Sequence, residues 1–497
     1  MKGVFIKMQN KEWKMLIGGE WVDSSSGETF EDISPVNGEV LWQIPKGTRE
    51  DAKSAIKAAV KAKQIFTKMT SIERAKFLYK AADRIEAQID ELAEILTKEM
   101  GKPIVQAKIE VQITADIFRA FAEESRRISG EVLPSENRGV WSFVVRVPRG
   151  VVAAISPWNY PYLLTANKLA AAVVTGNTVV LKPSSDTPVT GLKLGEILLE
   201  VGLPKGVINV VTGPGSTVGD ELTINPGINV VAATGETVTG KIIAEKAGKS
   251  FKKVLLELGG KSPFIVLEDA DIDRAVSAAL WGKFANAGQI CIAVDRILLD
   301  EEIAEEFINK FIQKVSNLNI GDPMQPQNHI GPLVNKTQLD RVQELVQDAI
   351  DQGANLRLGG KRLTKNVPQG GFFYEPTVLT NVTQEMKLMQ DEIFGPVAPI
   401  AVFSDVEEII KVANSVRYGL ASAVWTKDIN TALKIAEELE FGKVHINDTT
   451  FYDEPHGPHG GIKETGMGRE GGHYSIEDYM DYKWITINTT KEMYPFG

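Results

Sequence analysis

Two side chains in this sequence are of the types that carry out covalent catalysis. Cys291 is the only cysteine among 497 residues and lies in a Gly-Gln-Ile-Cys turn, and Glu257 lies between an apolar run and a Gly-Gly pair. A thiolate attacks a carbonyl carbon far better than a hydroxyl does at neutral pH, so Cys291 is a candidate nucleophile. Burying a carboxylate without a partner is costly, which makes Glu257 a candidate base. Taken alone, a single cysteine is more often a small buried hydrophobic side chain.

The composition excludes several classes of protein. The formal net charge is −10 and the isoelectric point is near 5.3. No basic excess is therefore available to neutralise the phosphates of a nucleic acid or of an anionic membrane. One cysteine excludes an intrachain disulfide and a cysteine-rich metal site. The five histidines show only a weak metal-ligand pair, His456/His459, which we assign to a loop, so we predict no bound metal.

Length and hydropathy set the scale of the architecture. At 497 residues the chain is too long for one hydrophobic core, and we expect two or three domains. Residues 1–8 contain no sustained apolar core, and no run in the chain approaches about 18 apolar residues. We therefore expect a cytoplasmic protein that does not enter a membrane.

A repeated strand and helix pattern between residues 151 and 258 predicts a parallel sheet. Apolar runs predict strands at Val151–Ile155, Thr178–Lys182, Val207–Thr212, Asn229–Thr234 and Val254–Leu258, with helices at 163–174, 187–201, 216–223 and 237–248. Fully apolar strands that alternate with helices are typical of a parallel sheet covered on both faces. Such sheets bind ligands at the carboxyl ends of their strands. The loops at those ends hold Asn159, Lys182, Gly213-Pro214-Gly215 and Thr234-Gly235.

Other elements flank this sheet. Short apolar runs predict strands within 15–45, and helical spacing predicts one helix from Asp51, a second from Thr70 to Gly101 and a third over 104–127. Trp141–Val147 alternates as a half-buried strand does. A second α/β unit follows from Asp269 to 440, with helices near 271–285, 301–318, 336–352, 405–415 and 430–440. We expect the site to lie in the cleft between the two units.

Four segments carry a resemblance to a known family. Glu257-Leu258-Gly259-Gly260-Lys261 and Phe284-x-Asn286-x-Gly288-Gln289-x-Cys291 resemble the active-site signatures of the aldehyde dehydrogenase superfamily. The segments 391–397 and 460–470 are also similar, with Thr465 in place of the usual Ser. The resemblance covers nearly the whole chain. It implies an α/β fold with a Rossmann-like parallel-sheet cofactor domain (1–127 and 149–257), an α/β catalytic domain (258–470) and a small β oligomerisation arm (128–148 and 475–497).

The resemblance also implies a reaction and a set of roles. Cys291 adds to an aldehyde, hydride passes to NAD(P)+, and water activated by Glu257 hydrolyses the resulting thioester. Asn159 and the Cys291 backbone N–H form the oxyanion hole, while Lys168 and Glu470 are either a proton relay or a simple ion pair. The alternatives are transfer of the acyl group to coenzyme A, which Glu257 argues against, and a non-catalytic relative. We expect a homo-oligomer, either a dimer or a tetramer.

The predicted cofactor is NADP or NAD. In the family, Lys182 reaches the adenosine ribose, Glu392 holds the nicotinamide ribose and Phe394 backs the ring. Ser185 lies where NAD-preferring relatives often have Glu, so NADP should be tolerated or preferred. Glu236 lies where the family usually has Ser, which brings a carboxylate to the expected phosphate site. The remaining predicted cofactor residues are Ser156, Pro157, Trp158, Ser184, Gly213, Gly215, Thr234, Gly235, Leu258 and Gly259.

The predicted substrate class rests on the lack of a cation in the expected pocket lining. Relatives that act on carboxylated or phosphorylated aldehydes often have Arg at one of two positions, which here hold Ile290 and Asn167. The expected lining contains no cation and consists of Tyr160, Leu164, Ile290 and the loop Thr449–Tyr452. We therefore expect an uncharged, apolar or aromatic aldehyde.

Overall fold

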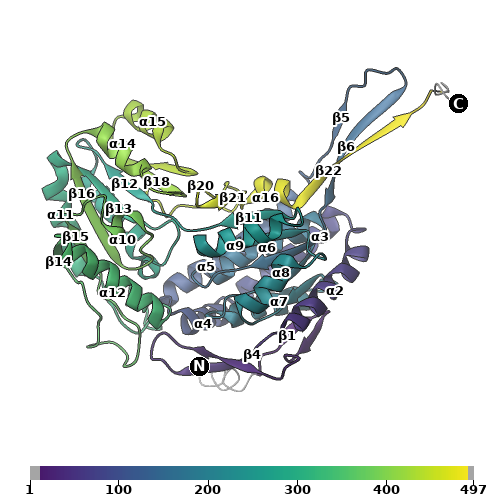
Figure 1. Ribbon diagram of the computed structural model, residues 1–497, viewed down its shortest axis with the longest axis horizontal. Helices are drawn as coiled ribbons and strands as arrows, with labels where there is room; N and C mark the ends of the chain where they lie inside the picture. The colour runs from purple at the N-terminus through teal and green to yellow at the C-terminus, as the bar shows by residue number, and fades with distance from the viewer. Residues whose placement is uncertain (1–11, 491–497) are drawn as a thin grey trace.

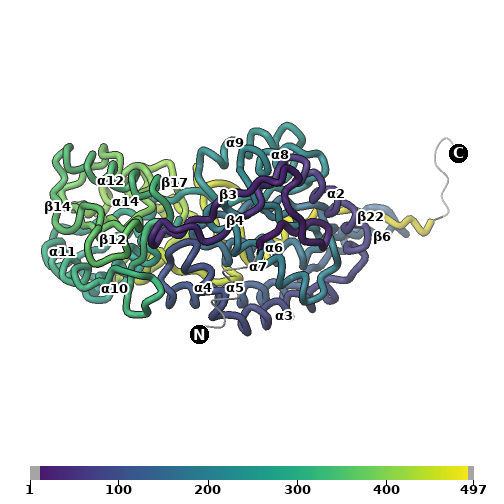
Figure 2. Tube along the Cα trace, turned by 90° about the horizontal axis from the view of Figure 1, so that it is seen from below, coloured from purple at the N-terminus to yellow at the C-terminus, as the bar shows by residue number. Residues whose placement is uncertain are grey.

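The computed structural model describes residues 12–490, which form two α/β units and a projecting antiparallel arm. The two units lie side by side, and the arm leaves the body from the first unit in both views (Figures 1 and 2). Two parallel-dominated sheets and a small antiparallel arm confirm the predicted fold class. Residues 1–11, at the start of the predicted cofactor domain, and 491–497, at the end of the predicted arm, lie outside the described residues.

The first sheet has eight strands, of which the central five are parallel. Their order is β9 (Ile208–Val210), β8 (Thr178–Lys182), β7 (Val151–Ile155), β10 (Val230–Thr234) and β11 (Lys253–Glu257). β1 (Met15–Ile17) and β2 (Glu20–Val22) extend one edge in antiparallel fashion, and β21 (Gly466–Met467) pairs antiparallel with β11 at the other. β9 is shorter than predicted because the chain soon turns at Gly213, where φ is 130°.

Helices cover both faces of this sheet, as the continuous apolar runs predict. Val151 and Ala153 point to one layer, and their neighbours Val152 and Ala154 to the other. The first layer contains α2 (Arg49–Phe66), a π-helical turn (Gly215–Gly219), α8 (Asp220–Ile224) and α9 (Thr237–Gly248). The second contains α3 (Ser71–Ala87), α4 (Ile89–Met100), α5 (Ile104–Glu124), α6 (Pro161–Thr175) and α7 (Pro188–Glu200).

Three predicted helices are corrected. The helix expected from Thr70 to Gly101 is broken at Gln88, whose backbone (φ −112°, ψ 17°) ends α3 and begins α4. The apolar stripe continues across the break, so periodicity alone did not reveal it. The helix expected over 104–127 ends at Glu124, and the one expected over 216–223 begins as the π-helical turn.

The second sheet has seven strands and is parallel except at one edge. The strand order is β14 (Asn355–Leu358), β15 (Thr377–Thr380), β16 (Val397–Phe403), β13 (Arg296–Asp300), β12 (Pro263–Val266), β18 (Ala421–Trp425) and β19 (Lys443–Ile446). Its helices are α10 (Ile272–Phe284), α11 (Glu301–Ser316), α12 (Lys336–Asp351), α13 (Lys387–Gln390), α14 (Val406–Asn414) and α15 (Ile429–Glu438). A small two-stranded pair, β17 (Tyr418–Gly419) and β20 (Ile462–Lys463), lies beside it.

The arm and an N-terminal hairpin complete the fold. β22 (Met480–Asn488), which follows α16 (Gly472–Tyr479), pairs along its length with β6 (Val140–Pro148), and β5 (Glu131–Leu133) pairs with the other edge of β6. The hairpin of β3 (Thr29–Ile33) and β4 (Val40–Pro45) reaches the second unit, where Phe372 N–H donates to Pro35 O at 3.0 Å. Among the described helices, none combines the length and apolar character that crossing a bilayer requires.

Candidate active site

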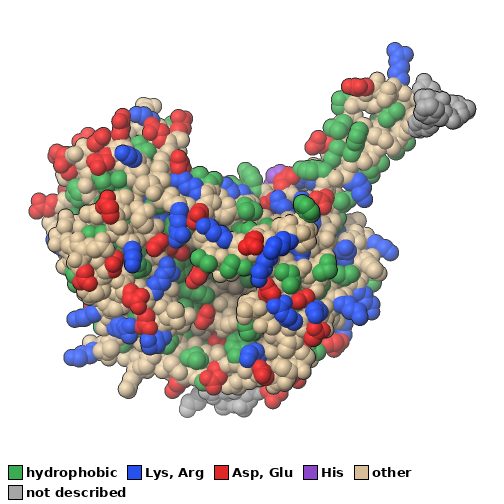
Figure 3. Space-filling model, viewed as in Figure 1, with side chains coloured by type: hydrophobic (Ala, Val, Ile, Leu, Met, Phe, Trp, Pro, Cys, Tyr) green, Lys and Arg blue, Asp and Glu red, His purple; other side chains and the backbone are tan. Residues whose placement is uncertain are grey.

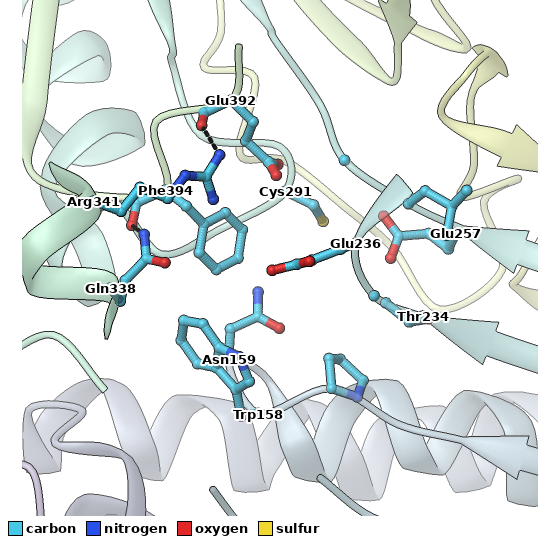
Figure 4. Close-up of a pocket in the computed structure, with 14 residues that line it drawn as sticks. Trp158, Asn159, Thr234, Glu236, Glu257, Cys291, Gln338, Arg341, Glu392 and Phe394 are labelled. Atoms are coloured by element: carbon cyan, nitrogen blue, oxygen red, sulfur yellow. Dashed lines mark hydrogen bonds between the residues drawn. The ribbon is translucent and has the colours of Figure 1, made fainter. Parts of the chain in front are cut away.

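The two units meet where the chain crosses from one sheet to the other. β11 ends at Glu257, residues 258–262 cross over, and β12 begins the second sheet at Pro263. Glu257 therefore comes from the first unit and Cys291 from the second, and both line one pocket (Figure 4). This is the location between the units that the sequence predicts.

A tight turn places Cys291. Three consecutive residues before it, 286–288, have positive φ values of 51°, 55° and 73°. The buried Gln289 side chain fixes the turn, because its amide donates to Asn286 O at 3.0 Å and its oxygen accepts a backbone N–H of a neighbouring loop at 2.9 Å. Gly260 provides the space, since a Cβ there would lie 2.1 Å from Cys291 O. The two glycine-containing motifs of the sequence thus pack directly against each other.

Asn159 faces the same pocket from the turn after β7. Its side-chain N–H donates to Gln289 O at 3.1 Å, within the cysteine turn. Its backbone oxygen accepts from Lys102 Nζ at 2.8 Å and from Asn286 Nδ2 at 3.2 Å. Asn159 and its three partners are buried. The predicted oxyanion donor is therefore held rigidly beside the thiol.

Glu257 and Cys291 lie close together, and a third residue, His459, completes the cluster. One ligand-type atom of each lies within 4.8 Å of the others. Burial raises the pKa of the Cys291 thiol well above its usual value, and the Glu257 carboxylate raises it further. Burial also acts to raise the pKa of Glu257, but His459 and Cys291 outweigh this effect and bring it below its usual value. At neutral pH the acid is therefore an anion and the thiol is protonated.

Lys168 and Glu470 form a buried ion pair behind the pocket. Lys168 Nζ donates to Glu470 Oε1 and to Thr234 Oγ1, both at 2.7 Å. Neither oxygen of the Glu257 carboxylate has a hydrogen-bond partner among the described residues. The contacts that the structure shows are those of the ion pair, and the proton relay stays a prediction.

Many of the residues predicted to contact the cofactor line the pocket of Cys291. Glu392 Oε1 accepts the Gly260 N–H at 2.9 Å, and the Phe394 ring packs edge-on against Trp158 with 5.3 Å between ring centres. Burial raises the pKa of Glu392 to about 8, so this carboxyl group can donate as well as accept hydrogen bonds. Figure 4 shows Glu236 pointing into the pocket from the start of α9. The other predicted residues in this lining are Pro157, Thr234, Gly235, Leu258 and Gly259.

A second groove, of about 580 Å³, lies over the carboxyl ends of β7 and β8 and is lined by Lys182 and Gly215. Burial lowers the pKa of Lys182 to about 8, and its Nζ donates to the adjacent Pro183 O at 2.8 Å. Two more cations line this groove, Arg49 and Lys246, each paired with Asp220 at 2.5 Å.

Four predicted cofactor residues make local contacts instead of lining either cavity. Ser185 Oγ donates to Gly213 O at 3.4 Å. Ser184 Oγ accepts the N–H of Asp186 at 3.3 Å, and Ser156 N–H donates to Lys182 O at 3.2 Å. All four lie within the strand-end loops that border the groove.

Three residues that line or adjoin the site were missed by sequence reasoning. Gln338 and Arg341, on α12, donate to the backbone oxygens of Phe394 and Glu392, both at 2.8 Å. They lie on an ordinary amphipathic helix, where nothing in the sequence sets them apart. His459 was assigned to a loop, and it does lie in one, but it is buried against Glu257. Its place directly before the similar segment 460–470 was the available signal.

The expected substrate lining forms an apolar wall beside the thiol. Ile290 belongs to a buried apolar cluster against which Cys291, Tyr160 and Phe451 pack. The rings of Tyr160 and Phe451 lie 5.9 Å apart, and Lys102 Nζ lies 3.3 Å from the Tyr160 ring centre. Lys102 is itself paired with Glu110, so it does not add an unpaired charge.

Comparison with known proteins identifies the family. The model of the aldehyde dehydrogenase family matches residues 21–485. The chain belongs to the aldehyde dehydrogenase family. This match spans nearly the whole chain and covers the second sheet, the first sheet except β1 and the start of β2, the pocket and most of the arm.

Aldehyde dehydrogenases of known activity and structure agree with this assignment. D-glyceraldehyde dehydrogenase (NADP(+)) of Thermoplasma acidophilum is 40% identical over 476 residues, 96% of each chain. Succinate-semialdehyde dehydrogenase [NADP(+)] of Escherichia coli is 40% identical over 472 residues, 95% of this chain and 97% of the relative. The crystal structure of betaine aldehyde dehydrogenase from Staphylococcus aureus in complex with NAD+ is 36% identical and has a TM-score of 0.97. The match covers 100% of this chain and 99% of the Staphylococcus chain. The protein is an NAD(P)-dependent aldehyde dehydrogenase that oxidises an aldehyde to the acid.

Proposed function

We propose that this aldehyde dehydrogenase works through a thioester on Cys291 that water then hydrolyses. The observation that carries the proposal is the meeting of the thiol and the anionic Glu257 carboxylate in one buried pocket. The thiol proton passes to solvent, and attack of the Cys291 sulfur on the aldehyde carbon gives a tetrahedral oxyanion. The Asn159 side chain, held beside Cys291, stabilises that charge by hydrogen bonding.

Release of product depends on Glu257. After hydride has left the substrate carbon, the acyl group remains bound to Cys291 as a thioester. Glu257 takes a proton from water, which attacks the thioester and releases the acid and the thiol. A carboxylate whose pKa lies below its usual value is ready to accept that proton at neutral pH.

The pocket fits the nicotinamide end of the cofactor, which accepts the hydride when it is bound. A Cβ at Gly235 would have open space around it, so the backbone here permits close approach of a ligand. Glu392 can donate to one ribose hydroxyl and accept from another, and Phe394 with Trp158 forms one wall. We assign the first α/β unit to cofactor binding and the second to catalysis.

For the adenosine end we propose that NADP is accepted at least as well as NAD. Ser185 presents a small hydroxyl where a carboxylate would repel a 2′-phosphate. Lys182 lines the nearby groove and supplies positive charge for that phosphate, whereas Arg49 and Lys246 are already paired with Asp220. The names of the Thermoplasma and Escherichia relatives specify NADP(+), whereas the Staphylococcus structure contains NAD+.

For the substrate we propose an uncharged aldehyde whose apolar or aromatic part packs on Tyr160, Ile290 and Phe451. The decisive experiment is a kinetic panel of benzaldehyde, hexanal, glyceraldehyde and succinic semialdehyde with each cofactor. We expect the highest kcat/KM with benzaldehyde or hexanal. A preference of more than tenfold for succinic semialdehyde would contradict the substrate class.

The rival reaction is acyl transfer to coenzyme A. Product analysis with and without coenzyme A separates the two reactions, because the hydrolytic enzyme forms the free acid in both cases. An acyl-coenzyme A product, formed only when coenzyme A is added, would contradict hydrolysis and support acyl transfer instead. The cytoplasmic location stays a prediction.

A further inference from the structure

His459 lies in the loop between β19 and β20 and is buried against the carboxylates of Glu257 and Asp453. Its Nε2 lies 3.6 Å from Glu257 Oε1, and its Nδ1 lies 2.5 Å from Asp453 Oδ2. His459 and Glu257 are both buried, and neither Glu257 oxygen has a hydrogen-bond partner among residues 12–490. Within the described part of the chain, the imidazole is therefore the one ion-pair partner of the carboxylate that we propose as the base.

The charges around the imidazole favour its protonated form. Burial and the ammonium of Lys443 act to lower the pKa of His459, but Asp453 and Glu257 outweigh them and raise it to about 9. Lys443 Nζ lies 3.0 Å from His459 Nδ1 and 3.5 Å from Asp453 Oδ2, so it shares the same carboxylate. Burial raises the pKa of Asp453, but His459 and Lys443 more than offset this and hold it well below its usual value.

We propose that His459, held as an imidazolium by Asp453, is a positioning residue that keeps the Glu257 carboxylate ionised and aimed at the thioester on Cys291. The inference rests on the proposed role of Glu257 as the base of hydrolysis. It assigns to the loop residues Asp453 and His459 a function that the family signatures around Glu257 and Cys291 do not include.

The other charged groups near the cluster do not replace this contact. Lys168, from α6, is bound to Glu470 and Thr234 at 2.7 Å each. The Glu470 backbone pairs with His459, and its carboxylate faces Lys168. An opposite charge within about 4–6 Å lowers a carboxyl pKa by roughly 1–3 units, whereas burial without such a charge raises it. Without His459, Glu257 would therefore take up a proton at a higher pH and stop acting as a base.

A small cavity, separate from the pocket of Cys291, borders the imidazole of His459. It is lined by Asp453, His459 and Asn167, among other residues, and lies between α5, α6 and the loop 453–459, away from the lining in which Glu392 and Phe394 lie. Two separate cavities thus flank the Glu257 and His459 pair. The hydrogen bond to Asp453 keeps the ring from turning into this second cavity and away from Glu257.

The test is the pH dependence of thioester hydrolysis in His459→Gln, which keeps a polar side chain but removes the charge. NAD(P)H formation is followed in the first turnover and in the steady state, from pH 4 to 9, with hexanal and saturating cofactor. We expect a first-turnover burst near one NAD(P)H per subunit, and an acid limb of the steady-state rate moved up by about one pH unit. On the acid limb, where the pH lies below the pKa of Glu257 in both enzymes, a shift of one unit lowers the steady-state rate roughly tenfold.

Further variants separate the possible outcomes. Asp453→Asn should move the acid limb in the same direction, because His459 loses the partner that raises its pKa. If His459→Gln does not fold, the acid limb of Asp453→Asn alone tests the role of His459. His473→Gln removes an exposed histidine that is paired with Glu477 and should change nothing. An unshifted acid limb, or a lost burst with cofactor still bound, would overturn the role of His459 while Glu257→Gln remains inactive in the steady state. Normal steady-state turnover by Glu257→Gln would instead overturn the proposed function itself.

Discussion

At the scale of single residues, the charge of each carboxyl group in the site depends on whether a neighbouring group offsets the effect of burial on its pKa. Glu257 is buried yet has a lowered pKa, whereas Glu392 is half-buried and has a raised one. The difference is the neighbour, since Glu257 faces the imidazole of His459 and Glu392 accepts only a backbone N–H from Gly260. Two carboxyl groups in one pocket are thus set for two tasks, proton acceptance and hydrogen bonding to a sugar.

Glu236 gives a prediction at this scale. Its carboxylate points into the pocket from the N-terminus of α9, where a cofactor phosphate is expected, and it makes no side-chain capping bond there (Figure 4). Two like charges about 4 Å apart in water repel by about 1 kcal/mol. Glu236→Ser should therefore tighten cofactor binding roughly three- to tenfold, as measured by fluorescence titration with NADP and NAD.

The matched control for this change is Glu245→Ser, on the same helix but outside the pocket. Glu245 is exposed and paired only with Lys249, so its loss should leave cofactor affinity unchanged. Unchanged or weaker binding by Glu236→Ser would show that the carboxylate does not oppose the cofactor.

At the scale of elements, a buried ion-pair cluster ties the catalytic segments together. Asp295 accepts from Lys261, which follows the Gly-Gly pair, from Lys283 in α10 and from the Ile393 N–H, at 2.8, 2.8 and 3.0 Å. One carboxylate therefore holds the crossover, the helix before the cysteine turn, and the segment that carries Glu392 and Phe394. Removing one partner of such a cluster leaves buried charge without compensation.

Asp295→Asn should therefore lower the free energy of unfolding by about 3–5 kcal/mol at pH 7, measured with urea. Burial acts to raise the pKa of Asp295, but Lys261 and Lys283 lower it to about 2. The unfolded value is about 3.9, so the stabilisation is complete above that pH and is lost as the pH falls towards about 2. The difference between wild type and variant should thus shrink by about 2–3 kcal/mol between pH 5 and pH 2.

Asp273→Asn is the matched control, because Asp273 is exposed and pairs with Lys310 at 2.9 Å on the surface. It should leave the free energy of unfolding nearly unchanged at any pH in this range, because exposed ion pairs contribute little. If Asp295→Asn had an equally small effect, the cluster would not be what holds these segments together.

The sequence predicted the elements better than the loops between them. The apolar strands of the first sheet and α9 lie where periodicity placed them, because burial on both faces leaves a continuous apolar run. The motifs around Glu257 and Cys291 predicted the pocket, because the close approach of two backbone segments requires glycines, which are visible in the sequence. His459 and its partners Lys443 and Asp453 could not be found in this way, because β19 and the irregular loop after it bring them to Glu257 from a distant part of the chain.

At the scale of the whole molecule, the described part of the arm leaves several large apolar side chains exposed. β5, β6 and β22 project from the body, and Figure 3 shows hydrophobic side chains along their surface. Trp484 is 70% exposed, Val132 66% and Ile487 50%. Exposed apolar surface of this kind marks an interface between proteins, and we propose that a second copy of this chain covers it.

Val132→Glu combined with Ile487→Glu should therefore dissociate the oligomer, because each change places a charge in a buried apolar contact. Sedimentation velocity should show a dimer or tetramer for the wild type and a monomer for the double variant. Phe251→Glu, at a residue that is 97% exposed but lies off the arm, should keep the wild-type assembly. A wild-type monomer, or an unchanged double variant, would contradict the role of the arm.

The covalent intermediate offers the most direct test of the account. Glu257→Gln is mixed with hexanal and NAD(P)+, NAD(P)H is followed in the first turnover, and the mass of the quenched enzyme is measured. We predict a burst of about one NAD(P)H per subunit, little turnover afterwards, and the added mass of the acyl group on the peptide that contains Cys291. Steady turnover at the wild-type rate, or a burst that leaves Cys291 unmodified, would contradict the account.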